Sequence, residues 1–226
     1  METLKNRQLG RLHANFQSLS ERIIQQYVLL EALMKDSGNK DVFASIKENE
    51  DLIDVFENEV RIEFINSLIL FTPRAKDLRK IVVYQDLTNF LERIGDLLTL
   101  IAQHLSKIDF DLPELKKFLV ILESMLSQSK DLVTKAIFSF YYEDKATVAR
   151  ILSKKGDTEK LCEQLEEMIL VNYQDLPLTE LELRSIISVN NIAHTITQVS
   201  NLGINSAESV VYFIDGVDIR HKKNDN

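Results

Sequence analysis

The sequence predicts an all-α protein made of two tandem three-helix bundles, with six long helices in all. Three observations predict this fold. Apolar residues recur in steps of three and four along most of the chain, which is the spacing of a buried helix face. The 226 residues include only six Gly and three Pro, so few positions favour tight turns. The pattern also restarts in the second half of the chain, which indicates a duplicated unit.

The first half shows three helical stripes. The first stripe runs from Leu9 to Leu33, misses one position at Gln26, and ends at residues 36–39, where Gly and Asn tolerate the left-handed conformation that ends helices. A second stripe runs through residues 42–70. Thr72-Pro73 is expected to open the third helix as its N-cap and first-turn proline. The third helix carries a narrow apolar seam, typical of a left-handed bundle, at Leu87, Leu91, Ile94, Leu98, Ile101 and Leu105.

The segment 106–113 is the expected joint between two domains, residues 1–108 and residues 109–226. After it we expect helices over about 114–140 and 143–173, the latter bent near Gly156. The last helix is expected to run from about 180 to 214, because Thr179 and Glu182 have the spacing of a capping box. No alternating strand pattern competes with these helices.

The two halves match in register. Residues 77–103 laid over residues 182–208 share five identities in 27 positions. The seam also carries over, because Leu87, Leu91, Ile94 and Leu98 fall on Ile192, Ile196, Val199 and Gly203. A shared register over four turns favours an internal repeat more strongly than the identities alone.

Composition narrows the class of protein. The net charge of −8 disfavours direct binding of DNA or RNA, because Lys and Arg are scattered. The single cysteine, Cys162, suits a reducing compartment. No apolar run approaches the roughly 18–20 residues that span a bilayer, and the N-terminus lacks an apolar signal core. We therefore expect a soluble, cytoplasmic protein without membrane insertion.

Two short motifs carry a resemblance to a known family. Asp77-Leu78-Arg79 is followed by the run Leu91-Glu92-Arg93-Ile94-Gly95-Asp96. Near the end of the chain stand the runs 207–216 and 218–221. Together with the helix count and the repeat, these segments resemble the PhoU family.

The resemblance implies a pair of three-helix bundles that usually form a homodimer. It also implies a role in negative regulation of a high-affinity phosphate transporter and its partner sensor histidine kinase. Glu-x-x-x-Asp motifs of that family hold Mg, Mn, Zn or multinuclear iron, so the resemblance points to Glu92 and Asp96 as metal ligands.

Glu92 and Asp96 lie four residues apart, so their side chains share one helix face. Their mutual repulsion costs a few tenths of a kcal/mol unless a cation lies between them. By helical geometry, this face lies about 140° from the apolar seam and should face outward. It belongs to a polar stripe of Gln85, Asn89, Glu92, Asp96, Thr99 and Gln103. The alternative is a solvated face on which Arg93 screens the two acids.

The second half departs from the metal motif. Thr197 and Asn201 stand where Glu92 and Asp96 would repeat, and neutral oxygens bind divalent cations weakly. The polar face itself persists as Asn190, His194, Thr197, Asn201, Asn205 and Glu208. Either this ladder is solvated, or His194 and Glu208 help to build a different ligand or partner surface. Beyond a divalent or multinuclear metal at the first repeat, we expect no cofactor.

No phosphate loop, nucleophile elbow or paired-cysteine zinc motif is present, so a catalytic role is not expected. The first hypothesis is a binding protein that restrains a phosphate transporter, its kinase, or both. The second is an accessory protein of another phosphate or sodium–phosphate carrier whose metal role is lost. The third is a structural helical adaptor unrelated to phosphate.

Overall fold

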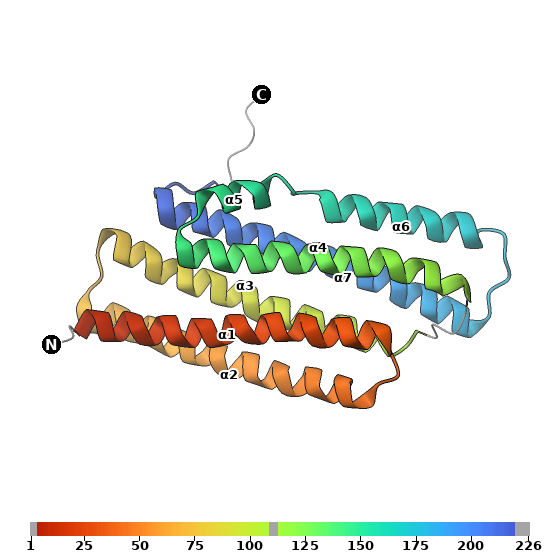
Figure 1. The fold of residues 1–226 in the computed structure, drawn as a ribbon, viewed down its shortest axis with the longest axis horizontal. Coiled ribbons are helices and arrows are strands. Elements are labelled where there is room, and N and C mark those ends of the chain that lie inside the picture. Colours follow the sequence, from red (N-terminus) through yellow and green to blue (C-terminus); the bar gives the residue numbers. More distant parts are fainter. Residues whose placement is uncertain (1–3, 109–112, 220–226) are drawn as a thin grey trace, which may run out of the picture.

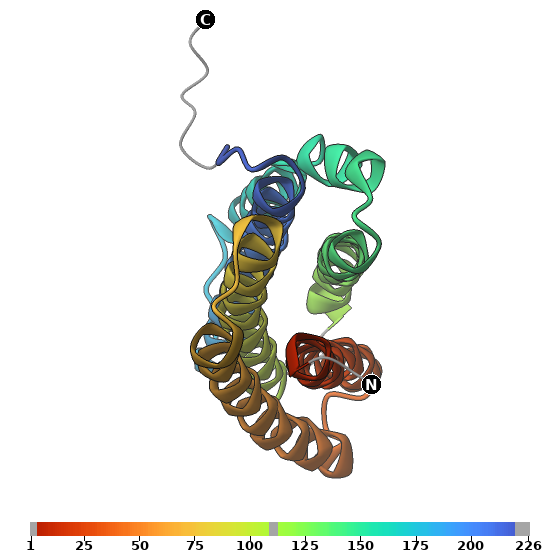
Figure 2. The same ribbon diagram turned by 90° about the vertical axis from the view of Figure 1, so that its left-hand side faces the viewer.

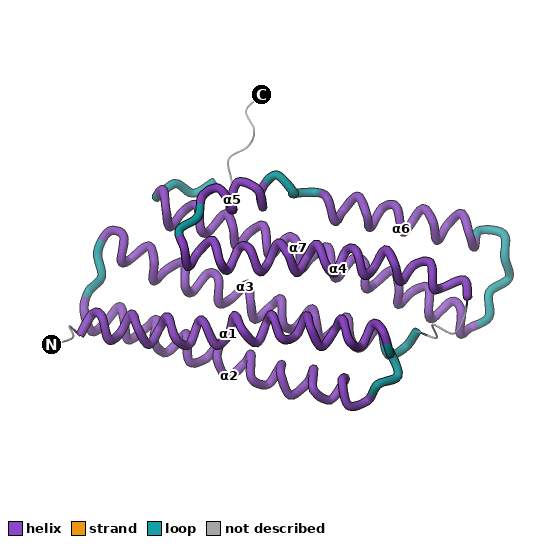
Figure 3. The backbone as a smooth tube through the Cα atoms, in the orientation of Figure 1, coloured by secondary structure: helices purple, strands orange, loops and turns teal. Residues whose placement is uncertain are grey.

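The structure is a computed structural model that describes residues 4–108 and 113–219. These residues form helices and connecting loops without a strand, which confirms the all-α prediction (Figure 3). The helices are α1 (Leu4–Lys35), α2 (Lys40–Phe71), α3 (Ala75–Leu105), α4 (Pro113–Tyr142), α5 (Lys145–Leu152), α6 (Asp157–Tyr173) and α7 (Glu180–Asp215). None of the described helices is long and apolar enough to cross a membrane.

The long helices run side by side and pack as two trios (Figure 1). Helices α1, α2 and α3 contact one another and form the first trio. In the second trio α7 contacts α4 and also α5 and α6, which together take the place of one long helix. The two trios meet mainly where α3 packs on α7, with a smaller contact between α1 and α4. Seen end-on in Figure 2, α2, α3 and α7 form a curved row with α1 and α4 on its inner side. The division into domains 1–108 and 109–226 stays a prediction, and residues 109–112 of the predicted joint lie outside the described residues.

The apolar seams form the core. The six predicted seam residues of α3 are all at most 2% exposed, and Ile192, Ile196 and Val199 of α7 are fully buried. Aromatic rings join the trios at one end, where the rings of Tyr84 and Phe140 meet edge to face with centroids 4.7 Å apart. The Tyr27 hydroxyl and Ser129 Oγ, 2.8 Å apart, form a hydrogen bond that links α1 to α4.

One break in the apolar pattern is a buried polar network. Gln26 is fully buried, and its side-chain amide donates to Thr99 Oγ1 at 2.9 Å. Asn49 of α2 donates to Gln26 Oε1 at 2.7 Å and so ties the three helices of this trio together. Thr99 is therefore an interior residue and does not belong to the outer polar stripe where the sequence placed it.

The start of α3 differs from the expectation. Thr72 ends α2 in the left-handed conformation, with φ 44°, and does not cap the next helix. Helix α3 begins at Ala75 with Arg74 as its N-cap, without a side-chain hydrogen bond. Residues 72–74 thus act as a linker, because Pro73 cannot continue α2 by donating to its backbone.

The predicted fifth helix is broken in two. Asp144 caps α5 by accepting hydrogen bonds from the backbone N–H groups of Ala146 and Thr147. The chain then leaves the helix at residues 153–156, where Gly156 has φ 90°, a left-handed value that favours glycine. The expected bend near Gly156 is therefore a full interruption between α5 and α6.

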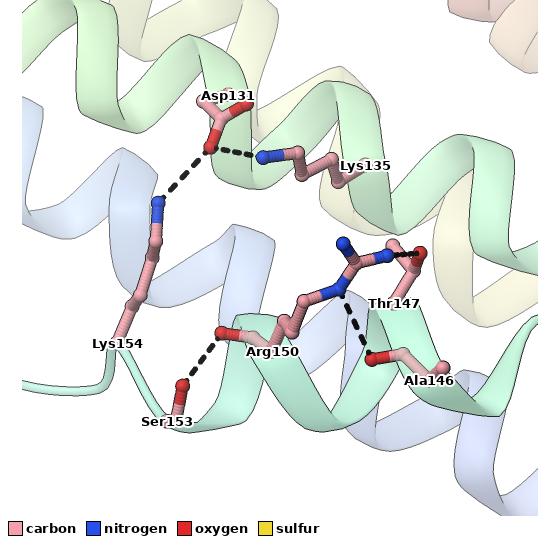
Figure 4. A network of polar contacts seen from close by, with 7 residues as sticks. All are labelled: Asp131, Lys135, Ala146, Thr147, Arg150, Ser153 and Lys154. Atoms are coloured by element: carbon pink, nitrogen blue, oxygen red, sulfur yellow. Dashed lines mark hydrogen bonds and ion pairs between the residues drawn. The ribbon is translucent and has the colours of Figure 1, made fainter.

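The break is anchored to α4 by charge. Lys154 Nζ lies 3.1 Å from Asp131 Oδ2, and Lys135 Nζ lies 2.8 Å from the same oxygen (Figure 4). These two lysines hold the pKa of Asp131 below its ordinary value, although partial burial opposes them. In α5, Arg150 donates to Thr147 Oγ1 at 2.7 Å, which stiffens the helix beside this anchor (Figure 4).

Helix α7 begins with the predicted capping box, which is confirmed. The Glu182 backbone N–H donates to Thr179 Oγ1 at 3.3 Å, and the Thr179 backbone N–H donates to Glu182 Oε2 at 2.8 Å. At its other end, the Gly216 N–H donates to the Tyr212 carbonyl at 2.9 Å. His221 of the family-like ending lies outside the described residues.

Gly95 sets the spacing between α2 and α3. A Cβ atom at this position would lie 3.0 Å from Ile53 Cδ1 and 3.2 Å from Ile53 Cγ2. Glycine therefore allows Ile53, which is 1% exposed, to pack directly on the α3 backbone. This close approach brings the outer faces of the two helices next to each other.

We expect Gly95→Val to lower the free energy of unfolding by about 1–3 kcal/mol, because the added methyl groups overpack the contact with Ile53. Denaturant unfolding measures this loss. Gly10→Val is the matched control, since a Cβ atom at residue 10 meets nothing within 4 Å. In the Ile53→Ala background the cost of Gly95→Val should shrink, because the two sites share one contact. A Gly95→Val protein as stable as the wild type would contradict this account.

Candidate functional site

The predicted metal residues lie on the outer face of α3. Asp96 is exposed and Glu92 is half-buried, one turn apart beside the buried seam residues Leu91, Ile94 and Leu98. The seam fixes this orientation, because a helix that buries those three positions turns residues 92 and 96 away from the core.

Helix α2 contributes three further acids that the sequence analysis missed. Glu50 and Glu57 are half-buried and Asp54 is exposed. Their electrostatic coupling to Glu92 and Asp96 shows that the two helices present these carboxylates to one another. We call Glu50, Asp54, Glu57, Glu92 and Asp96 the acidic face. Two of the three α2 acids could have been found from the sequence, since Glu50 and Asp54 repeat the Glu-x-x-x-Asp spacing of Glu92 and Asp96.

The acidic face is electrostatically strained. Partial burial raises the pKa of Glu92, and the charges of Asp96, Glu57 and Asp54 raise it further. Burial and the charge of Asp96 also raise the pKa of Glu50 and of Asp54. Each of these acids thus holds its proton more firmly than a free side chain would, because desolvation and like charges disfavour the ionised form.

The donor set of the acidic face fits a hard cation. It supplies only carboxylate oxygens, which are the ligands that Mg²⁺, Ca²⁺ and Mn²⁺ prefer. Within the described residues, these carboxylates do not converge as a group of three within 4.8 Å. A divalent cation between these carboxylates would offset the repulsion among their charges. Chemically, the face can attract and hold cations.

The other residues of the α3 stripe that lie outside the core, Gln85, Asn89 and Gln103, are uncharged. Asn89 and Gln103 are exposed, as expected. The Gln85 side-chain amide donates to Asn89 Oδ1 at 2.8 Å along the same helix. Asn89 and Gln103 are therefore open to solvent or to a partner, but they carry no charge that would attract a metal ion.

The polar ladder of α7 is only partly open to solvent. His194 is exposed, and Asn190, Thr197, Asn201 and Asn205 are half-buried. Glu208 was expected on the same surface but is 8% exposed, and its carboxylate pairs with Lys155 Nζ at 3.3 Å. The turn between α5 and α6 supplies that lysine and covers this end of α7, so Glu208 is an interior residue whose charge is compensated.

His194 meets two residues of α6. Its Nε2 atom lies 2.8 Å from Glu166 Oε1, and its Nδ1 atom lies 3.7 Å from Cys162 Sγ. Cys162 is 4% exposed, while the side chains of His194 and Glu166 are 50% and 40% exposed. Burial raises the pKa of the Cys162 thiol, and the charges of Glu166, Glu163 and Glu159 raise it further. We call Cys162, Glu166 and His194 the thiol–imidazole cluster.

From the sequence, Cys162 indicated only a reducing compartment, and His194 was grouped with Glu208 and not with residues of α6. The pairing depends on which face of α6 meets α7. Cys162 and Glu166 are four residues apart and so share a helix face, which was a usable signal. Nothing in the sequence by itself set that face against His194.

A family model described as the PhoU domain matches residues 17–105. A curated relative from Aquifex aeolicus, named phosphate-specific transport system accessory protein PhoU homolog, is 27% identical over 147 residues, which is 65% of this chain and 65% of that protein. The alignment thus spans just under two thirds of the Aquifex protein. A relative from Serratia marcescens, named phosphate-specific transport system accessory protein PhoU, is 19% identical over 222 residues, covering 96% of this chain and 89% of that protein.

Solved structures share the fold. The crystal structure of PhoU from Pseudomonas aeruginosa superimposes with a TM-score of 0.83 at 19% identity, over 94% of this chain and 99% of that chain. The phosphate transport system regulatory protein PhoU from Streptococcus pneumoniae gives a TM-score of 0.82 at 18% identity, over 95% and 99% of the two chains. The domain match over residues 17–105, the relatives along most of the chain and the shared fold agree in making this chain similar to proteins of the PhoU family.

Proposed function

We propose that this chain is a non-catalytic regulator of phosphate transport that acts by binding other proteins of a phosphate transport system. Relatives that align along most of the chain are named as accessory proteins of such systems. The observation that carries the proposal is the acidic face, a charged surface built by α2 and α3 on the outside of the bundle. Such a surface can bind a cation and a partner without any covalent step.

The acidic face is the proposed regulatory site. Glu92 and Asp96 are the first ligands we assign to a divalent or multinuclear metal, with Glu50, Asp54 and Glu57 opposite them on α2. Oxygen donors from two helices would let one cation bridge α2 and α3 and relieve the repulsion between them. The metal would thereby stiffen the surface that a partner meets.

The proposed partners are the cytoplasmic components of a phosphate transporter, its sensor histidine kinase, or both. The chain would work in the cytoplasm as a homodimer and hold the transport system off by occlusion when phosphate is plentiful. Exposed polar residues beside the acidic face, Asn89 and Gln103, would lie at the edge of that contact.

A second candidate is an accessory role for another phosphate or sodium–phosphate carrier. The observation that favours it is the loss of both acids at Thr197 and Asn201, which leaves the second half without the carboxylate pair of the first. A structural adaptor unrelated to phosphate is the third reading of the same bundle.

Affinity capture from membranes of cells grown at high and low phosphate distinguishes these roles. We expect the tagged chain to recover phosphate-transporter components or a sensor kinase in amounts that change with phosphate. The Glu92→Gln/Asp96→Asn variant should lose that phosphate dependence, whereas Glu123→Gln, an exposed acid on α4, should keep it. Recovery of a single carrier at both phosphate levels would favour the second role, and recovery of neither class would contradict the proposal.

We expect Asp96→Asn to stabilise the metal-free protein and to abolish stabilisation by Mg²⁺ or Mn²⁺. Removing this charge relieves repulsion with Glu92, Glu50 and Asp54, worth about 0.5–1 kcal/mol once solvent screening is included. That corresponds to a rise in Tm of about 1–4 °C at pH 7 in chelator, measured by thermal unfolding.

The sign of the pH effect follows from the raised pKa values of Glu50, Asp54 and Glu92. In the wild type, protonation of these acids stabilises the fold as the pH falls from 7 through their raised values. The advantage of Asp96→Asn should therefore shrink as the pH falls through the raised pKa values of Glu50, Asp54 and Glu92. Glu123→Gln should leave both the Tm and the metal response unchanged. An Asp96→Asn protein that still gains stability from Mg²⁺ and Mn²⁺ would exclude Asp96 as a ligand.

A further inference from the structure

The thiol–imidazole cluster lies next to the place in the second half that matches the acidic face of the first, since Cys162 falls on Glu57 while Glu166 and His194 fall on Arg61 and Asn89. Residues 57, 89 and 92 fall on residues 162, 194 and 197 at the repeat offset of 105. In the first half Glu57 of α2 is coupled to Glu92 of α3. In the second half Cys162 of α6 interacts with Thr197 of α7. The two helix pairs therefore meet in the same register, but the donors at the meeting point have changed.

We propose that Cys162, Glu166 and His194 form a binding site for Zn²⁺. A thiolate, an imidazole and one carboxylate are the donor types that zinc takes in proteins, and three protein ligands leave a fourth position open to solvent. This set differs from the acidic face, whose oxygens alone suit harder cations.

The distances fit this assignment. The three donor atoms all lie within 4.8 Å of one another. Bond lengths of about 2.3 Å for Zn–S and about 2.0–2.2 Å for Zn–N and Zn–O place tetrahedral ligand atoms about 3.3–3.6 Å apart. The contact of 3.7 Å between Cys162 Sγ and His194 Nδ1 is already close to that spacing. Shifts of about 1 Å in the partly exposed His194 and Glu166 side chains would close the set.

The surroundings favour a cation and give it a way in. Glu159, Glu163 and Glu166 lie near the thiol and make the local potential negative. His194 and Glu166 are reached from solvent, whereas Cys162 forms the buried floor of the cluster. As the Zn–S bond forms, the thiol proton is released to solvent, so one proton leaves the cluster for each thiolate ligand.

Binding of Zn²⁺ and Co²⁺ to the purified full-length chain tests the site. We expect one Zn²⁺ per chain in this cluster. With Co²⁺ as the probe, a thiolate-to-metal charge-transfer absorption should appear. Cys162→Ser should remove that absorption and weaken Zn²⁺ binding by more than about tenfold, the loss that even outer-shell partners of a metal cause. His194→Gln should weaken Zn²⁺ binding to a similar extent.

We expect both variants to remain folded, because Cys162→Ser changes a single atom and His194 is exposed. Thermal unfolding in chelator checks this expectation. Glu92→Gln/Asp96→Asn is the matched control and should retain the Co²⁺ absorption and the Zn²⁺ bound at the cluster. A wild-type chain without the charge-transfer absorption would overturn the proposal. So would Zn²⁺ binding that survives Cys162→Ser and His194→Gln but is lost in Glu92→Gln/Asp96→Asn.

Discussion

Burial of the apolar seams of α3 and α7 is the constraint on which the rest of the structure depends. These two helices each pack against several others and against one another. The cations of Lys76 and Lys80, near the start of α3, lie over the ring of Phe213, near the end of α7, so the pair runs antiparallel. A rotation of either helix that exposed Ile94 or Val199 would forfeit the burial of an entire seam. The outer faces therefore have little freedom, and whatever residues stand there are presented at fixed positions.

The seam was predictable because its information is local. Steps of three and four residues place Leu91, Ile94 and Leu98 on one face whatever surrounds them, and the capping box at Thr179 is a contact within one turn. The outward direction of Asp96 follows from the same local rules. Thr72 misled the prediction because a threonine before a proline serves equally in a linker, and only the geometry of the connection decides between them.

Residues whose role depends on a neighbouring helix were harder to predict. Gln26 interrupts an apolar stripe, so the sequence pattern alone gives no reason for a polar residue there. The structure supplies the reason, because Thr99 and Asn49 form hydrogen bonds with the buried Gln26 side chain. Glu208 repeats the polar face in sequence, yet the broken fifth helix brings Lys155 over it and buries it. The acidic face depends on the close approach at Gly95, which places Glu50 near Asp96. The apolar periodicity of one helix does not say which residues of a neighbouring helix lie opposite it.

The two halves show how one helix pair can hold different chemistry. Five carboxylates on the acidic face carry about five negative charges when ionised, and one bound dication would reduce that to about three. Salt screens such a change within about 8 Å, so only a partner that touches α2 and α3 would sense it. On the proposed function, a cation at this face thus acts as a contact switch and not as a long-range signal.

The second half keeps the same helix register but pairs a thiol with an imidazole, and softer donors respond to a different set of ions. If both proposed sites bind their ions, the repeat places a ligand on the same helix pair in each half while the donor residues set which ion each half takes.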